Sequence, residues 1–274
     1  MKRNTNSHRG MTKVEFLVVL AIIGILILLL LPATECSREA PRRMQCTNNI
    51  KVLGIGIHNY HDKHEAFPPA IGLIELAVSE EPESGEASEV STALPKPASW
   101  SWRVRILPFI EQKKLFDQFH FDEPWDSEHN LTVAETMPDY FSCPSDNPEE
   151  KVINAHAVPL TSYVMITGSD TIGSPDGNTL TWDDVKDGRS NTLMIVEVTG
   201  DYRPAWTEPV DISIADLRRN VNAVHGKSIG SQHPGGANIG LCDGSVHFFS
   251  DEGVSGKRLQ QLGRINDGTP DDWD

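Results

Sequence analysis

The sequence RGMTKVEFLVVLAIIGILILLLLP, residues 9–32, decides how the rest of the chain is interpreted. Its sixteen residues 16–31 carry no polar side chain. As a helix rising about 1.5 Å per residue, this run is about 24 Å long, slightly short of the roughly 30 Å hydrocarbon core of a bilayer. Met11 and Val14 extend its apolar character. The sequence therefore predicts a helix that spans a membrane with help from its flanks.

Basic residues precede this run, and residues 1–14 contain no acid: the bases are Lys2, Arg3, Arg9 and Lys13. Because positive charge is retained on the cytoplasmic side, the N-terminus is expected in the cytoplasm and the rest across the membrane. An ordinary signal peptide would end in a small-x-small cleavage site, and none follows here. We expect a single-pass inner-membrane protein whose bulk lies in the periplasm or outside the cell.

A single carboxylate, Glu15, stands at the start of the apolar run. On insertion scales a charge deep in a bilayer costs about 2.5–3.5 kcal/mol, and less near the edge. An acid at this position therefore either reaches back to the interface or has a positively charged partner.

The residues Gly10-Met11-Thr12-Lys13-Val14-Glu15, with the apolar run after them, resemble the N-terminal signal of type IV pilins and type II secretion pseudopilins. Pro32 also stands where those helices carry a proline. The resemblance implies that a prepilin peptidase cleaves between Gly10 and Met11, and that the new N-terminus is methylated. It also implies that Glu15 pairs with the N-terminal amine of a neighbouring subunit. Further implied partners are other pilin-like subunits, their assembly machinery and the membrane.

Apolar residues continue at helical spacing beyond the proline, at Cys46, Ile50, Leu53, Ile57 and Tyr60. The chain is thus expected to have three parts: a leader at 1–10, a long helix at 11–66 with a membrane half at 11–32 and a soluble half at 33–66, and an extracytoplasmic head at 67–274.

The head is expected to combine short helices with β-strands after residue 160, among them the buried-strand candidate 192–198. Residues 75–99 hold six Glu among Ser, Ala and Pro, which predicts a disordered acidic loop. The predicted fold class is α+β, with a long N-terminal membrane-spanning helix packed on a mainly antiparallel β head, as in pilins.

Residues 66–274 hold 34 acids and 15 bases, a net charge of −19. This charge repels phosphate and argues against a nucleic-acid partner. No cofactor is expected, apart from a possible calcium ion. Asp183, Asp184 and Asp187 offer the oxygen ligands that calcium prefers, although they lack the spacing of an EF-hand.

The four cysteines, Cys36, Cys46, Cys143 and Cys242, would enter an oxidising compartment in this topology, which permits disulfides. Four cysteines allow three full pairings. We favour a disulfide between Cys46 and Cys143, which would tie the helix to the head. Four reduced, buried thiols are the alternative.

Asp243-Gly244 lies between two alternating runs and predicts a β-hairpin with a two-residue type I′ turn. In that register Leu241 faces Val246 and Ile239 faces Phe248. These four apolar side chains then share one face of the hairpin, which is the predicted core face.

His233, nine further residues and Asp243-Gly244 match the H-x9-DG motif of a large bacterial family of pilin-like proteins with a C-terminal domain of unknown function. The resemblance implies a pilin-like architecture over nearly the whole chain and assigns no activity. Further motifs occur in the family's order: Arg42-Arg43-Met44-Gln45-Cys46, Asn49, His58-Asn59-Tyr60-His61, Phe67-Pro68-Pro69, Trp100-Ser101-Trp102-Arg103, Phe141-Ser142-Cys143-Pro144-Ser145-Asp146, Asp187-Gly188, Ser190-Asn191-Thr192 and Trp206-Thr207-Glu208-Pro209.

The sequence therefore predicts a prepilin-like structural subunit, processed after Gly10 and methylated, that assembles into a pseudopilus or pilus-like filament for secretion or attachment. The alternative is a membrane-anchored extracytoplasmic module that binds glycan, peptide or metal, with His233, Asp243 and tryptophans in its site, and that forms no filament. An enzyme is not expected. The sequence has no His-Glu-x-x-His, phosphate loop or Gly-x-Gly-x-x-Gly.

Overall fold

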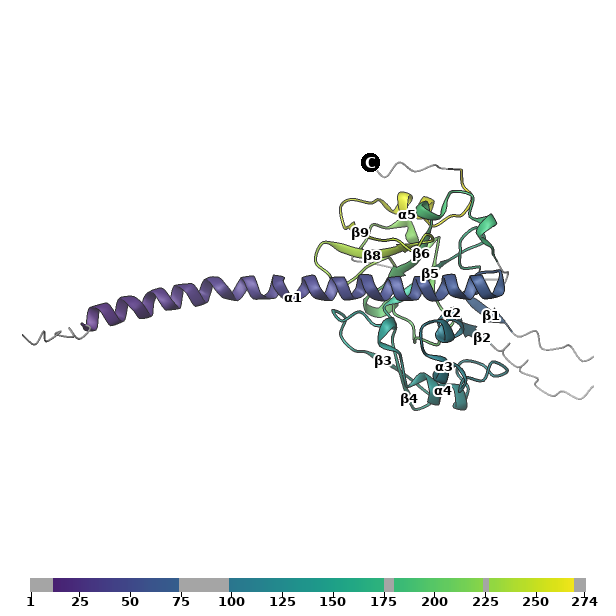
Figure 1. The fold of residues 1–274 in the computed structure, drawn as a ribbon, viewed down its shortest axis with the longest axis horizontal. Coiled ribbons are helices and arrows are strands. Elements are labelled where there is room, and N and C mark those ends of the chain that lie inside the picture. The colour runs from purple at the N-terminus through teal and green to yellow at the C-terminus, as the bar shows by residue number, and fades with distance from the viewer. Residues whose placement is uncertain (1–11, 74–98, 175–179, 224–226, 269–274) are drawn as a thin grey trace, which may run out of the picture. The chain divides into compact units, whose positions relative to one another are not determined.

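The computed structural model describes residues 12–73, 99–174, 180–223 and 227–268 (Figure 1). The predicted leader with its cleavage site at Gly10 and Met11 lies outside the described residues, as does the acidic loop up to residue 98. The chain divides into two compact units, Met1–Arg42 and Arg43–Asp274. The second unit contains the head and the C-terminal part of the long helix.

The long helix, α1, runs over Lys13–His64, 52 residues. At its start, the Thr12 backbone N–H donates to Glu15 Oε2 at 2.7 Å and the Glu15 N–H donates to Thr12 Oγ1 at 3.3 Å. This reciprocal pair is a capping box, which satisfies two backbone donors at the helix N-terminus. At the other end, Glu65 has φ +57° and its N–H donates to His61 O at 2.7 Å, as at a left-handed C-terminal cap.

The predicted membrane-spanning helix is wrong, since none of the helices in the described part of the chain has the length of apolar sequence needed to cross a membrane. The physical reason is length. A spanning helix needs about 20 predominantly apolar residues. The run 16–31 supplies sixteen, with the charged residues Lys13 and Glu15 immediately before it. The corrected fold class is α+β without the predicted membrane-spanning helix among the described residues. It is built from α1 and a head with a five-stranded mixed sheet.

The sheet has the order β7-β5-β6-β8-β9. The pair β5–β7 is parallel and the other three pairs are antiparallel, which makes the sheet mixed. The strands are β5 Tyr163–Thr167, β6 Leu193–Glu197, β7 Ile212–Ser213, β8 Gly236–Leu241 and β9 Val246–Ser250.

Two hydrophobic clusters cover this sheet, and successive residues of β5 alternate between them, which places the clusters on opposite faces. One contains the C-terminal half of α1, whose predicted apolar stripe is confirmed: Cys46, Ile50, Leu53 and Ile57 are at most 1% exposed. The other contains the helix α5, Gly256–Leu262, which buries Leu259 and Leu262. Because both faces are covered, β6 and β8 are buried along their whole length.

Smaller elements complete the head (Figure 1). Two antiparallel hairpins are β1–β2, Ile71–Leu73 with Ser99–Ser101, and β3–β4, Glu150–Ile153 with His156–Pro159. The short helices are α2 Trp102–Arg105, α3 Lys113–Phe116 and α4 Glu128–Ala134. The 3-10 turns are η1 Leu107–Phe109, η2 Asp139–Phe141, η3 Trp182–Asp184, η4 Arg189–Asn191, η5 Gly200–Tyr202 and η6 Asp216–Arg218.

The hairpin β8–β9 forms, but its predicted register is wrong by one residue. Val246 pairs with Gly240 rather than with Leu241. The Gly244 N–H donates to Leu241 O at 3.0 Å, and Gly244 has φ +84°. A turn closed in this way and followed by a residue with positive φ makes a three-residue loop, one residue longer than the type I′ turn.

A slip of one residue moves every side chain of a strand to the opposite face. Phe249, which the predicted register placed outside, is therefore buried at 6% exposure. Phe248, predicted in the core, is only half-buried, and Arg43 lies over its ring with 4.6 Å to the ring centroid.

Two glycines of α1 give a matched test of how closely the helix packs. A Cβ on Gly56 would lie 2.7 Å from Ile110 Cγ2, whereas a Cβ on Gly54 would lie 3.5 Å from Met194 Cε, an ordinary contact. We expect Gly54→Ala to stabilise the protein by up to about 1 kcal/mol through helix propensity. Gly56→Ala should instead destabilise it by about 1–3 kcal/mol through overpacking. Urea unfolding of the two variants checks this, and equal effects would contradict the packing described here.

Candidate functional site

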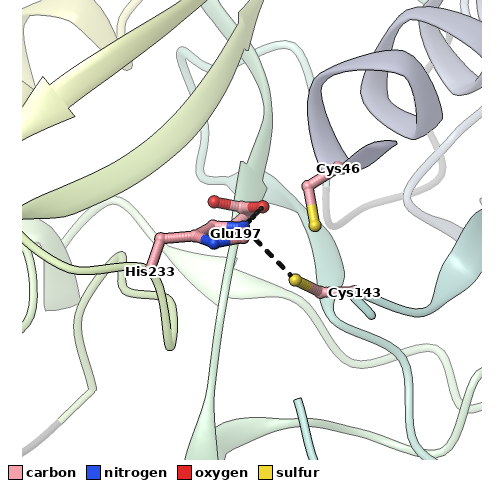
Figure 2. A group of neighbouring side chains, drawn as sticks. All are labelled: Cys46, Cys143, Glu197 and His233. Carbon is pink, nitrogen blue, oxygen red and sulfur yellow. Dashed lines mark hydrogen bonds and ion pairs between the residues drawn. The ribbon is translucent and has the colours of Figure 1, made fainter. Parts of the chain in front are cut away.

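Four buried side chains with metal-ligating or acid-base chemistry meet between α1 and the sheet (Figure 2). They are Cys46, Cys143, Glu197 and His233, each at most 2% exposed. One ligand atom from each lies within 4.8 Å of all the others. Among the described residues, these four are the His, Cys, Asp or Glu side chains close enough together to share one metal ion.

Each residue comes from a different segment. Cys46 lies on the buried stripe of α1, and Glu197 is the last residue of β6. Cys143 follows η2, where its backbone N–H donates to Ser162 Oγ at 2.9 Å. His233 lies in the loop before β8. The cluster therefore forms only when the helix, the sheet and two loops are all in place.

Nε2 of the histidine ring faces both the Cys143 thiol and the Glu197 carboxylate (Figure 2). This nitrogen is 3.5 Å from Cys143 Sγ and 3.9 Å from Glu197 Oε1. On the other side of the ring, Nδ1 is 3.4 Å from Ser145 Oγ. The His233 backbone N–H donates to Ser231 Oγ at 3.1 Å, which fixes the loop that carries the ring.

Asn238 orients the carboxylate of Glu197. The Asn238 backbone N–H donates to Glu197 Oε2 at 2.5 Å, and its side-chain Nδ2 donates to the same oxygen at 3.1 Å. Asn238 Oδ1 in turn accepts from Thr47 Oγ1 at 3.1 Å, next to Cys46 on α1. Hydrogen bonds thus link the helix to the acid through one side chain.

The environment shifts the acidities within this cluster. A hydrogen bond between the two thiols lowers the pKa of Cys143 and raises the pKa of Cys46, so that Cys143 is the sulfur that ionises first. Burial is the main cause that raises the pKa of Glu197 to about 7. Two sulfurs, an imidazole and a carboxylate in this arrangement can hold a metal ion, and the two sulfurs alone can form a disulfide.

The predicted disulfide partners Cys46 and Cys143 are neighbours in this cluster and are both free thiols in the structure. The disulfide stays a prediction. Cys242 is a third buried free thiol. It lies elsewhere, and its carbonyl oxygen is 2.9 Å from His58 Nε2.

The structure separates the residues of the H-x9-DG motif. His233 lies in the buried cluster, whereas Asp243 and Gly244 form the exposed turn of the β8–β9 hairpin. Asp243 Oδ1 accepts from the Ser245 N–H at 2.8 Å and from Ser245 Oγ at 2.6 Å. The Asp-Gly pair thus has a local role in shaping the turn.

Two of the aspartates predicted to bind calcium, Asp184 and Asp187, accept hydrogen bonds from other groups of the protein. Asp184 Oδ2 accepts from the Thr181 N–H at 2.7 Å and from Thr181 Oγ1 at 2.9 Å. The two oxygens of Asp187 accept from the backbone N–H groups of Asp267 and Gly268, at 2.7 and 3.0 Å. Asp183 lies beside Asp184 in η3. A calcium site at these residues stays a prediction.

Glu197 is the functional candidate that the sequence interpretation missed. The signal was present, because Glu197 is the one charged residue in the buried-strand candidate 192–198. A carboxylate in a core strand is costly to bury, and its presence indicates a partner. The sequence contains no indication of which partner, since Cys46, Cys143 and His233 are between 36 and 151 residues away.

The comparisons with known proteins agree on one class. The sequence model of a family described as protein of unknown function (DUF1559), which is a pilin-like family, matches residues 36–253. The chain is also 34% identical over 68 residues to the competence protein ComGC of Halalkalibacterium halodurans, a pilin-like protein. That match covers 25% of this chain and 67% of ComGC. No solved structure matches the chain.

Proposed function

The chain belongs to the DUF1559 family of pilin-like proteins, and on this premise we propose that it is a subunit of a pilus-type assembly. In the finer form of the proposal, a prepilin peptidase cleaves it after Gly10, Met11 becomes the methylated N-terminus, and the mature chain joins a pseudopilus or pilus-like filament for secretion or attachment. Its partners are other pilin-like subunits and their assembly machinery. Catalysis has no part in the proposal.

The observation that supports it most strongly is the exposed apolar surface of α1. Over residues 14–27 the large apolar side chains are 44–70% exposed, all around the helix axis: Val14, Phe16, Leu17, Val18, Val19, Leu20, Ile22, Ile23, Ile25, Leu26 and Ile27. A helix that is apolar on every side is stable only when it is buried against other elements. Bundling with the same helix of neighbouring subunits provides that burial.

Glu15 is suited to select the neighbour. Its side chain is exposed, and the hydrogen bonds from Thr12 lower its pKa, which keeps the carboxylate ionised. An ionised acid beside an apolar helix surface would lose its hydration when that surface packs. Pairing with the positively charged N-terminal amine of a processed neighbour would offset this cost.

The first test is the intact mass and N-terminal sequence of the protein isolated from its native cells, for the wild type and for Gly10→Ala. We expect a mature chain that begins at a methylated Met11, and a Gly10→Ala chain that keeps residues 1–10. A native wild-type chain that still carries residues 1–10 would contradict the processing step.

The second test separates the charge of Glu15 from its role in the capping box. Glutamine at this position can still accept from the Thr12 N–H, so Glu15→Gln keeps the cap and loses only the charge. We expect Glu15→Gln to weaken subunit association by at least about 100-fold, as for a buried ion pair deprived of one partner at about 3 kcal/mol. The readout is the amount of filament sheared from cells, at matched protein levels.

The control is the exposed ion pair between Lys113, the first residue of α3, and Asp117, the residue after that helix. Asp117→Asn removes one negative charge from the head and should leave filament yield unchanged. Wild-type filament yield from Glu15→Gln would show that the charge of Glu15 is not needed for assembly.

A further inference from the structure

We propose that Cys46, Cys143, Glu197 and His233 bind one zinc ion, which ties helix α1 to the head. The inference is independent of the filament proposal. It concerns a buried site in the second compact unit, whereas assembly is attributed to the N-terminal part of α1.

The ligand set has the chemistry that zinc prefers. Thiolate sulfur, imidazole nitrogen and carboxylate oxygen are its three protein ligand types, and structural sites are closed by four of them. Calcium and magnesium take oxygen ligands, so two sulfurs argue against both. Two cysteines together with a histidine also favour zinc over the carboxylate-rich sites of manganese.

The distances already approach those of a tetrahedral site. Bond lengths of roughly 2.0–2.3 Å imply ligand atoms roughly 3.3–3.8 Å apart. Cys143 Sγ and His233 Nε2 are 3.5 Å apart, inside that range. His233 Nε2 and Glu197 Oε1 are 3.9 Å apart, and all four ligand atoms lie within 4.8 Å of one another. Closure around an ion thus requires the widest of these separations to shorten by about 1 Å.

The surrounding residues orient the ligands. In zinc sites the second nitrogen of a ligating histidine is typically hydrogen-bonded, and ligating carboxylates have partners of their own. Here His233 presents Nε2 to the cluster while Nδ1 faces Ser145 Oγ at 3.4 Å. Asn238 fixes the carboxylate of Glu197 through its backbone N–H and its side chain.

Burial and charge also favour a cation. Two thiols and a carboxylate gather at a helix–sheet interface where each residue is at most 2% exposed, and a bound metal ion would take them as two thiolates and a carboxylate. Uncompensated charges are costly in such surroundings, and a divalent ion is the largest local compensating charge available. A disulfide between Cys46 and Cys143 would neutralise the sulfurs but would leave the convergence of His233 and Glu197 unexplained.

Zinc and the disulfide exclude each other, because the sulfurs that bind zinc must be thiolates. The test uses the full chain isolated from native cells, with free thiols alkylated at lysis in one sample and metal content measured in a second. We expect one zinc per chain and no bond between Cys46 and Cys143. A disulfide-linked chain without zinc would overturn the proposal.

A second measurement identifies the ligands. Chelated, reduced chain is titrated with cobalt(II) and then with zinc, with the visible absorption of tetrahedral, thiolate-bound cobalt as the readout. The wild type and Cys242→Ser, which loses a buried thiol outside the cluster, should each bind one cobalt with thiolate absorption that zinc abolishes. Cys143→Ser and His233→Gln should bind at least about 100-fold more weakly. If either variant fails to fold, the wild-type spectrum still decides: no thiolate absorption in the wild type overturns the site.

Discussion

Asp211→Ala should destabilise the head by about 3–5 kcal/mol, among the largest effects expected of any single substitution in this chain. Its carboxylate forms an ion pair with Arg103 at 2.6 Å, and both side chains are fully buried. Removing one member of a buried pair leaves the other charge without compensation in a medium of low polarity. The loss therefore far exceeds that of an exposed salt bridge.

The pair is also the centre of a hydrogen-bond network. Asp211 Oδ1 accepts from Trp102 Nε1 at 3.1 Å and from the Met165 N–H at 2.8 Å. Arg103 donates through Nε to Tyr163 O at 3.0 Å. One ion pair thus connects α2, strand β5 and the segment before β7. Two residues of the Trp-Ser-Trp-Arg segment, Trp102 and Arg103, thus contribute hydrogen bonds to the core.

Urea unfolding with a double-mutant cycle checks this prediction. We expect Asp211→Ala and Arg103→Met each to cost several kcal/mol. The double variant Arg103→Met/Asp211→Ala should lose less than the sum of the two single losses but stay destabilised, because the Met165 N–H and Trp102 Nε1–H still lack their acceptor. The matched control is Asp117→Ala in the exposed pair with Lys113, expected to change stability by less than about 0.5 kcal/mol. A loss of stability below about 1 kcal/mol for Asp211→Ala would contradict the proposal that the buried ion pair stabilises the head.

The sequence correctly predicted elements that can be recognised from the spacing of their own apolar residues. The stripe from Cys46 to Ile57 has the spacing of an α-helix and is buried on α1. The continuous apolar run at 193–196 is a central strand, because both faces of the sheet are covered. In both cases the periodicity of apolar residues reports directly on burial.

Other features depend on contacts that a linear pattern does not contain. The hairpin at Asp243-Gly244 was placed correctly, but its register depended on whether one glycine closes a two-residue or a three-residue loop. The membrane-spanning interpretation rested on sixteen apolar residues and on help from their flanks, which is too short a run. The length of the loop decided the register of the hairpin, and the length of the apolar run decided whether the helix can span a membrane.

In the candidate site, too, some residues could be predicted from the sequence, whereas their contacts with one another could not. Cys46 and Cys143 were paired on the sequence alone, and the structure brings them together as free thiols. His233 was singled out through a motif, yet it meets these thiols and Glu197 rather than Asp243. Each of the four residues is positioned by a different segment, so only the assembled helix, sheet and loops bring the set together.

Trp206→Ala should destabilise the head by about 3–5 kcal/mol, the range for deleting a fully buried aromatic side chain. The side chain is 0% exposed, and its ring stacks on Phe141 with 5.6 Å between centroids. Its Nε1 donates to Ala134 O at 2.7 Å. That carbonyl belongs to the last turn of α4, where backbone acceptors have no partner within the helix.

Trp206→Phe separates packing from the hydrogen bond. It keeps a ring against Phe141 but leaves the Ala134 carbonyl buried without its donor, at an expected cost of about 1–3 kcal/mol. Hydrogen exchange provides the specific readout, because the amides of α4 should lose protection beyond the global change. Tyr202→Ala, at a side chain that is 40% exposed, is the control and should have a small effect. If Trp206→Ala were equally mild, the tryptophan would be free to serve as a ligand platform, as in the binding-module alternative; a large loss assigns it to the core.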